Sequence, residues 1–283
     1  MLSILLAALG LVAPGTTADA RPGDLPLLVV ERSRVIWPQR CLPRESQVPA
    51  ELQSLMRKTL GEKSLFLGDG RMDEVTFGSA ECMHGECGSG QFAVPLVVRE
   101  SERTGLVLPS GRIDPSAIHP LRLVGVEGTD PDDLRPRLAA ALESPPPCGE
   151  PPPAPSASPG GGLLVTCLSH LEASGDLGVQ VQGRGRIQEN GYAHYEVVRF
   201  RMLERRDGKR VLGRWIAQPR GKGSRLPVPV AAVPAIKGAE VRLLWLHREG
   251  ICCPSAASAW VTDVGKQVRE GPRHVAGFGQ PCD

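Results

Sequence analysis

Apolar residues in the first half of the chain change their spacing from one segment to the next. Residues 25–32 (LPLLVVER) form a nearly continuous apolar run, which predicts a buried strand. Residues 49–63 (PAELQSLMRKTLGEK) repeat their apolar positions at helical spacing, and Pro49 suits the first position of a helix. The stripe of this predicted helix consists of Leu52, Leu55, Met56 and Leu60.

The next segments continue to alternate between strand and helix patterns. Residues 64–68 (SLFLG) predict a short strand. Residues 92–100 and 104–111 predict a hairpin, and residues 119–128 predict a further strand. Residues 129–144 (TDPDDLRPRLAAALES) open with a capping residue, a proline and two carboxylates, which favour the start of a helix. The apolar stripe of this second helix consists of Leu134, Leu138 and Leu142.

The second half of the chain has an all-β pattern. Short apolar or alternating runs are separated by Gly, Pro and Asp-Gly turns, which predicts a sandwich or a small barrel of about seven strands. The predicted strands are residues 163–171, 177–183, 194–203, 210–218, 226–233, 239–247 and 257–264.

A proline-rich segment separates the two patterns. Residues 145–162 (PPPCGEPPPAPSASPGGG) contain little that can enter a helix or a sheet, because proline fixes φ and lacks an amide donor. The chain is therefore expected to have an α+β fold. It would consist of an α/β domain over residues 21–144 and a β-rich domain over residues 163–283.

The first 20 residues (MLSILLAALGLVAPGTTADA) resemble a signal peptide. The apolar run from Leu2 to Ala13 is shorter than the roughly 20 residues needed to cross a bilayer, and Ala18-Asp19-Ala20 fits a cleavage site. We therefore expect export to the periplasm or the cell surface, with no transmembrane helix after the signal is removed.

Export changes the interpretation of the cysteines. The chain has eight, and an even count in an oxidising compartment predicts disulfides. Four precede the predicted β-rich domain and four fall within it, so pairing inside each half is possible, but the connectivity stays open. The candidates are Cys41, Cys82, Cys87, Cys148, Cys167, Cys252, Cys253 and Cys282.

The segment CMHGEC holds the densest group of potential ligands. Cys82, His84 and Cys87 offer three of the four ligands that zinc prefers. The spacing matches neither a zinc knuckle nor a C-x-x-C redox pair. We favour a local Cys82–Cys87 disulfide, with a metal site as the alternative.

Other signals of chemistry are weak. A G-x-G-x-x-A match beginning at Gly88 lacks the strand before it and the helix after it that a dinucleotide site requires. No phosphate-binding loop, H-E-x-x-H or G-x-S-x-G motif occurs, so no cofactor and no catalytic residue are predicted. The net charge of +2 gives no reason to expect nucleic-acid binding.

One basic segment is a candidate contact surface. An Asp207-Gly208 turn predicts a tight hairpin, in which Arg205 faces Arg210, Arg206 faces Lys209, Arg201 faces Arg214 and Phe200 meets Trp215. Facing like charges are unfavourable unless solvent or an anion separates them, and both explanations are open. The candidate anion-binding or partner-binding residues are Arg199, Arg201, Arg205, Arg206, Lys209, Arg210 and Arg214.

The first half also carries a family resemblance. The element order and the segments LPLLVVER, VPAELQSLMRKTLGE, ECMHGECGSGQFAVPLVVRE and HPLRLVGVEG, within residues 25–144, resemble the amino-terminal α/β domain of the periplasmic TolB family. The segments are also similar to the related domain of curli-secretion lipoproteins. The resemblance implies an α/β fold that contacts envelope proteins and performs no catalysis.

Together these patterns predict an exported, disulfide-stabilised binding protein of the bacterial periplasm or cell envelope. Its expected partner is an envelope or secreted protein, or an anionic envelope polymer. The alternative is an exported hydrolase or metal-dependent enzyme whose site forms between the two domains.

Overall fold

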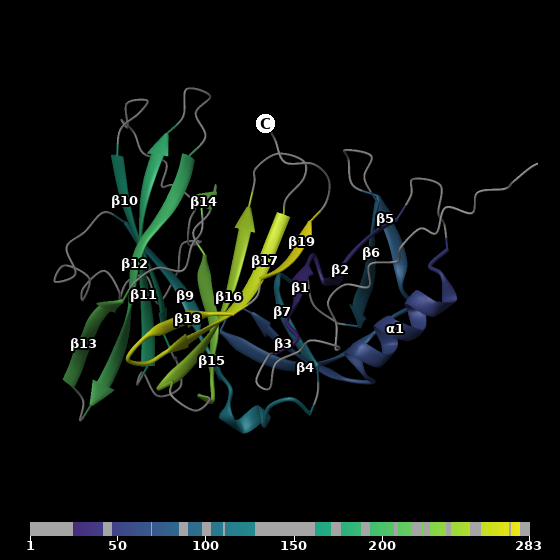
Figure 1. Cartoon of the computed structure of the whole chain (residues 1–283), viewed down its shortest axis with the longest axis horizontal. Helices are drawn as coiled ribbons and strands as arrows, with labels where there is room; N and C mark the ends of the chain where they lie inside the picture. The colour runs from purple at the N-terminus through teal and green to yellow at the C-terminus, as the bar shows by residue number, and fades with distance from the viewer. Residues whose placement is uncertain are drawn as a thin grey trace, which may run out of the picture.

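The computed structural model describes fifteen stretches of the chain. In them β-strands form three sheets, and a single α-helix, α1, is present (Figure 1). No helix in these stretches is long and apolar enough to cross a membrane. The stretches are residues 25–41, 47–68, 70–84, 90–97, 103–109, 111–127, 162–170, 177–187, 193–206, 209–216, 222–223, 227–235, 239–249, 256–271 and 273–277.

The first sheet closes into a β-barrel. Its strands follow the order β2-β1-β7-β3-β4-β6, and β6 pairs again with β2, so six strands form the closed ring while β5 lies beside β6. Every pairing in the ring is antiparallel. The elements are β1 (Leu28–Glu31), β2 (Arg34–Cys41), α1 (Ala50–Leu60), β3 (Ser64–Gly68), β4 (Arg71–Phe77), β5 (Glu81–His84), β6 (Gly90–Val97) and β7 (Gly105–Pro109).

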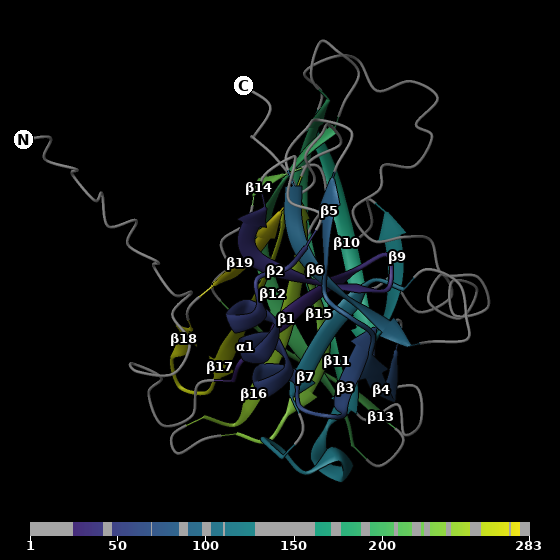
Figure 2. The same ribbon diagram turned by 90° about the vertical axis from the view of Figure 1, so that its right-hand side faces the viewer.

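The interior of the barrel is an apolar core that helix α1 completes. All six ring strands contribute buried side chains to it, including Trp37 from β2 and Phe92 from β6. From α1 the stripe residues Leu52, Met56 and Leu60 pack into the same core. The predicted helix is thus confirmed, and Figure 2 shows it lying across the near side of the barrel.

The predicted α/β domain is wrong, because this part of the chain is a β-barrel with one helix. The segment after the first predicted strand, for which no element is predicted, contains β2. This strand follows a two-residue turn at Arg32 and Ser33, which have φ of 48° and 58° without the Asn-Gly signal usual for such turns. The predicted hairpin is also wrong, since β6 pairs with β2, β4 and β5 while β7 pairs with β1 and β3. The second predicted helix, residues 129–144, lies outside the described residues.

The other two sheets contain all seven strands predicted for the second half, which confirms those strands. The central sheet has the order β18-β17-β16-β15-β8 with β19 on β17, and the outer sheet has the order β13-β12-β11-β10-β9 with β14 on β12. The central sheet contains β8 (His119–Pro120), β15 (Val228–Val233), β16 (Val241–Glu249), β17 (Ala256–Val264), β18 (Val268–Glu270) and β19 (His274–Gly277). The outer sheet contains β9 (Arg122–Glu127), β10 (Gly162–His170), β11 (Leu177–Ile187), β12 (Ala193–Arg206), β13 (Lys209–Ile216) and β14 (Lys222–Gly223).

Two strands that precede the predicted linker pair with strands that follow it. Strand β8 pairs with β15 in the central sheet, and β9 pairs with β10 in the outer sheet. Between them lies the buried Leu121, whose amide donates to the carbonyl of Val230 at 2.8 Å. The chain therefore enters both later sheets before residue 128. The predicted signal peptide lies outside the described residues, and so does the predicted linker except for Gly162 at the start of β10.

The central sheet is buried on both faces. One face packs Leu244 and Leu246 against barrel residues such as Val29 and Leu106. The opposite face packs Trp245, Trp260 and their neighbours against Val179, Val181 and Phe200 of the outer sheet. The central sheet accordingly lies between the barrel and the outer sheet (Figure 1).

Candidate functional site

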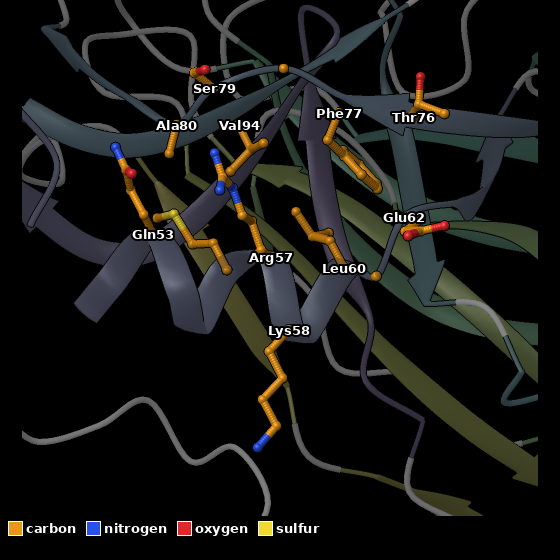
Figure 3. Close-up of a pocket in the computed structure, with 13 residues that line it drawn as sticks. Gln53, Arg57, Lys58, Leu60, Glu62, Thr76, Phe77, Ser79, Ala80 and Val94 are labelled. Atoms are coloured by element: carbon orange, nitrogen blue, oxygen red, sulfur yellow. The ribbon is translucent and has the colours of Figure 1, made fainter. Parts of the chain in front are cut away.

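A groove of about 580 Å³ opens between helix α1 and the strand break that separates β4 from β5 (Figure 3). Its floor is apolar and consists of Met56, Leu60, Phe77, Ala80 and Val94. Polar side chains surround this floor. They are Gln53, Arg57, Glu62, Thr76 and Ser79, while Lys58 borders the groove with its side chain directed away from it (Figure 3).

The end of α1 forms one wall of the groove. Gly61 has φ of 70°, a left-handed conformation that glycine adopts without strain, and its amide donates to the carbonyl of Arg57 at 2.8 Å. The buried Ser64 hydroxyl then donates to the carbonyl of Leu60 at 2.6 Å. These bonds end the helix and turn the chain into β3, which leaves the last helical turn facing the groove.

An irregularity in strand pairing forms the other wall. Phe77 lies opposite Leu96 and Glu81 lies opposite Ala93, so residues 78–80 on one strand face residues 94–95 on the other. The extra residue bends the strand away, as a β-bulge does, and Gly78 remains attached through its amide to the carbonyl of Pro95 at 2.8 Å. The groove lies where this bend separates the strand from the helix.

A disulfide and an ion pair hold β5 in place. Cys41 at the end of β2 is bonded to Cys82 in β5, with 6.0 Å between their Cα atoms. Arg34 of β2 also pairs with Glu81 of β5 at 2.7 Å, between side chains that are both partly exposed. Both contacts join β5 to β2, so the strand that continues the groove wall is anchored from the far side of β6.

The bridge corrects the pairing expected within CMHGEC. Cys82 bonds to Cys41 and not to Cys87, because β2 and β5 both flank β6 and bring their cysteines together. Cys87 lies outside the described residues. Cys82 therefore has no thiolate to offer a metal ion, and no group of three potential ligands occurs among the residues that the structure places. The disulfide thus removes Cys82 from the zinc site considered at Cys82, His84 and Cys87.

Of the other cysteines, the structure describes Cys167 alone. Cys167 lies in β10, opposite Val181 of β11 and Gly125 of β9. The remaining candidates lie outside the described residues. These are Cys148, Cys252, Cys253 and Cys282.

Basic residues on the helix differ in direction. In Figure 3 the Arg57 side chain extends toward Ala80 and Val94, whereas Lys58 points away from the groove. Beyond the helix, Lys63 pairs with Glu74 at 2.5 Å, and this hydrogen bond raises the pKa of Lys63 above its ordinary 10.5. Glu62 lies at the other end of the groove, under Thr76 (Figure 3).

Strands β12 and β13 of the basic hairpin pair as predicted near Arg206 and Lys209 but have a shifted register farther along. Arg205 lies opposite Arg210 and Arg206 opposite Lys209, which confirms the pairs nearest the turn. Farther along, Arg201 lies opposite Trp215 because the register shifts between Arg201 and Leu203, so the predicted Arg201–Arg214 and Phe200–Trp215 pairs are wrong. Arg199 lies opposite Gln182 of β11. The hairpin is the end of the outer sheet away from the barrel (Figure 1).

Sequence reasoning missed the groove. Leu52, Leu55, Met56 and Leu60 identified the buried face of α1, but Gln53 and Arg57 beside that stripe carried no motif. The strand break at residues 78–80 (GSA) was the one available signal, since small residues often mark an irregular strand.

Comparisons with known proteins identify no relative: no family model, curated protein or solved structure matches this chain.

Proposed function

We propose that this chain is a non-catalytic binding protein of the bacterial periplasm or cell envelope. The observation that carries the proposal is the groove between α1 and the β4–β5 break. Its volume of about 580 Å³ lies within the usual range for ligand sites, and an apolar floor inside a polar rim is typical of recognition. The rim offers an amide, a guanidinium, hydroxyls and a carboxylate, which are groups that orient a bound partner.

Export remains part of the proposal. The Cys41–Cys82 disulfide supports it, because disulfides persist mainly in oxidising compartments. An envelope or secreted protein is the partner that fits this location.

A second contact surface is the basic hairpin formed by β12 and β13. Arg205 and Arg210 lie directly opposite each other, as do Arg206 and Lys209. This clustering of like charges favours contact with an anionic envelope polymer or an acidic partner. The surface would act together with the groove, from the opposite end of the molecule.

A catalytic site between the barrel and the later sheets is not proposed. The described residues in that position form a continuous apolar layer, which includes Val29, Leu106, Leu244 and Leu246. One ion pair, Arg248–Glu31 at 3.0 Å, joins β16 to β1 at this interface.

Photocross-linking tests the proposal. The photoreactive residue p-benzoylphenylalanine replaces Ser79 in the groove wall of the full mature chain, and a matched chain carries it at Ser54, an exposed residue of α1 that does not line the groove. After irradiation with envelope extract, Ser79 is expected to give a discrete cross-linked protein that Ser54 does not give. Equal labelling at both positions, or none at Ser79, would show that the groove is not the binding site.

A further inference from the structure

The wall of the groove continues directly into an edge strand. Among the described strands, β5 ends the order of the first sheet and has one strand neighbour, β6. The six ring strands have neighbours on both sides because β2 and β6 close the barrel. Strand β5 is therefore the edge strand of this sheet among the described strands.

We propose that the groove and the outer edge of β5 together bind an extended segment of the partner protein, with an apolar residue next to an acidic one. This inference rests on the proposed function and specifies its ligand. The segment would add a strand to β5 and place its apolar side chain on the groove floor. Strand addition combined with a side-chain pocket is a recurrent mode of peptide recognition.

The floor accounts for the apolar residue. Met56, Leu60 and Val94 are buried at the base of the groove, and Phe77 and Ala80 are half-buried beside them. Side chains alternate along an added strand, so one side chain in two would point toward this floor. Because Ala80 lines the groove and Glu81 begins β5, the strand edge and the floor are continuous along the chain.

Arg57 accounts for the acidic residue. Its guanidinium extends over the groove between the helix and Ala80, and the ion pairs of the described residues do not include it (Figure 3). The carboxylate of Glu62 lies at the opposite end of the groove (Figure 3). A partner carboxylate beside the apolar residue would gain a charge-assisted hydrogen bond from Arg57.

The disulfide makes β5 a firm template. Strand addition requires an edge that keeps its shape, and β5 is attached to β2 through Cys41–Cys82 and Arg34–Glu81 in addition to its pairing with β6. A short strand without these attachments would bend away from an incoming segment.

The test uses a displayed library of random hexapeptides selected on the full mature chain. Enriched peptides are expected to pair an apolar with an acidic residue. For a synthetic copy of the best peptide, Arg57→Glu should weaken binding by about tenfold or more, the scale of one charge-assisted contact. Arg112→Glu is the matched control, since it makes the same charge change at an exposed arginine that does not line the groove, and it should alter binding by no more than about twofold.

A second peptide tests the strand. Methylating alternate backbone amides removes strand pairing but keeps every side chain, so binding should be lost with at least one of the two methylation patterns. The inference is overturned if no peptide is enriched, if Arg57→Glu and Arg112→Glu act alike, or if both methylated peptides bind normally. A partner that still cross-links at Ser79 in that case leaves the proposed function intact, whereas loss of that cross-link overturns the function itself.

Discussion

The barrel and the central sheet solve the problem of burying a β-sheet in opposite ways. The barrel closes on itself and fills its inside with its own side chains and helix α1, so much of its outer surface can carry charges. The central sheet instead is covered by other parts of the chain on both faces. Variation is therefore tolerated better on the barrel than in the central sheet, and the groove is found on the barrel.

The two regions also differ in how far their burial depends on other parts of the chain. The barrel's own strands and helix enclose its interior, but part of the barrel's outer face is buried only because the central sheet packs on it. The outer sheet likewise buries Val179, Val181 and Phe200 against the central sheet. The central sheet is thus the element that all the others share.

Removing a large side chain from the central sheet should have the largest effect. Trp245 is fully buried, makes an edge-to-face contact with Phe200 at 5.4 Å and stacks on Trp260 at 6.1 Å between ring centroids. Trp245→Ala should lower the free energy of unfolding by about 3–5 kcal/mol, through lost burial and the cavity left behind. Urea denaturation followed by circular dichroism measures this loss.

The same experiment tests whether the barrel depends on the central sheet. If the central sheet is shared, the indole NH resonance of Trp37 in the barrel, followed by NMR, should be lost in the same transition as the far-ultraviolet strand signal. Trp245→Phe keeps an aromatic ring and serves as the milder control. A barrel that unfolds separately, at its own urea concentration, would show that its closed core is sufficient without the central sheet.

Loss of the disulfide should give the next largest effect, and this effect should begin in the barrel. Cys41 and Cys82 are 41 positions apart, and a bridge closing a loop of this length contributes about 3–4 kcal/mol by restricting the unfolded chain. The double variant Cys41→Ala/Cys82→Ala should lose about this much relative to the oxidised protein in urea denaturation.

Reduction is the matched control for that variant. Adding a thiol reductant should destabilise the wild type by about this much more than it destabilises the double variant, because the variant has no Cys41–Cys82 bridge to reduce. Hydrogen exchange should rise first in β5, which the bridge attaches to β2. Exchange rising equally in β16 and β17 would contradict a barrel-confined role.

These two regions also show what the sequence can predict. The central strands read as near-continuous apolar runs, such as residues 241–246 (VRLLWL), because both of their faces are buried, and their positions were predicted well. In the barrel, β4 (RMDEVTF) is exposed or half-buried at every position except Val75, so its pattern gave no strand signal. Local spacing detects burial, and burial on two faces gives the clearer signal.

Long-range pairing was the part that the sequence could not supply. Cys82 has Cys87 five positions away but bonds to Cys41, since the partner depends on which strands flank β6. The groove depends on the same topology, because Arg57 and Ala80 meet only when α1 crosses the β4–β5 break. The Arg205–Arg210 pair was predictable, since a two-residue turn fixes the nearby register, but the shift beyond Leu203 was not.

The smallest effect should come from an exposed ion pair on the barrel. Lys63 and Glu74 lie 2.5 Å apart, and 57% of each side chain is exposed, so the pair contributes little. The hydrogen bond from Lys63 to Glu74 raises the pKa of Lys63 above 10.5 in the folded protein. A raised pKa means that the contribution is fully present below pH 10.5 and is lost as the pH rises through the higher folded pKa.

Glu74→Gln should therefore cost stability at about pH 9 and cost less at a pH above the raised folded pKa of Lys63, where the side chain is neutral in both the folded and the unfolded chain. Urea denaturation of wild type and variant at the two pH values measures the difference. Glu31→Gln is the matched control at the interface with the central sheet, because its partner Arg248 keeps its charge throughout this range. Its cost should stay constant with pH and exceed that of Glu74→Gln, since the Glu31 side chain is only 9% exposed. If the two variants lose the same free energy of unfolding, ion pairs on the barrel's exposed surface and at its buried contact with the central sheet do not differ in strength.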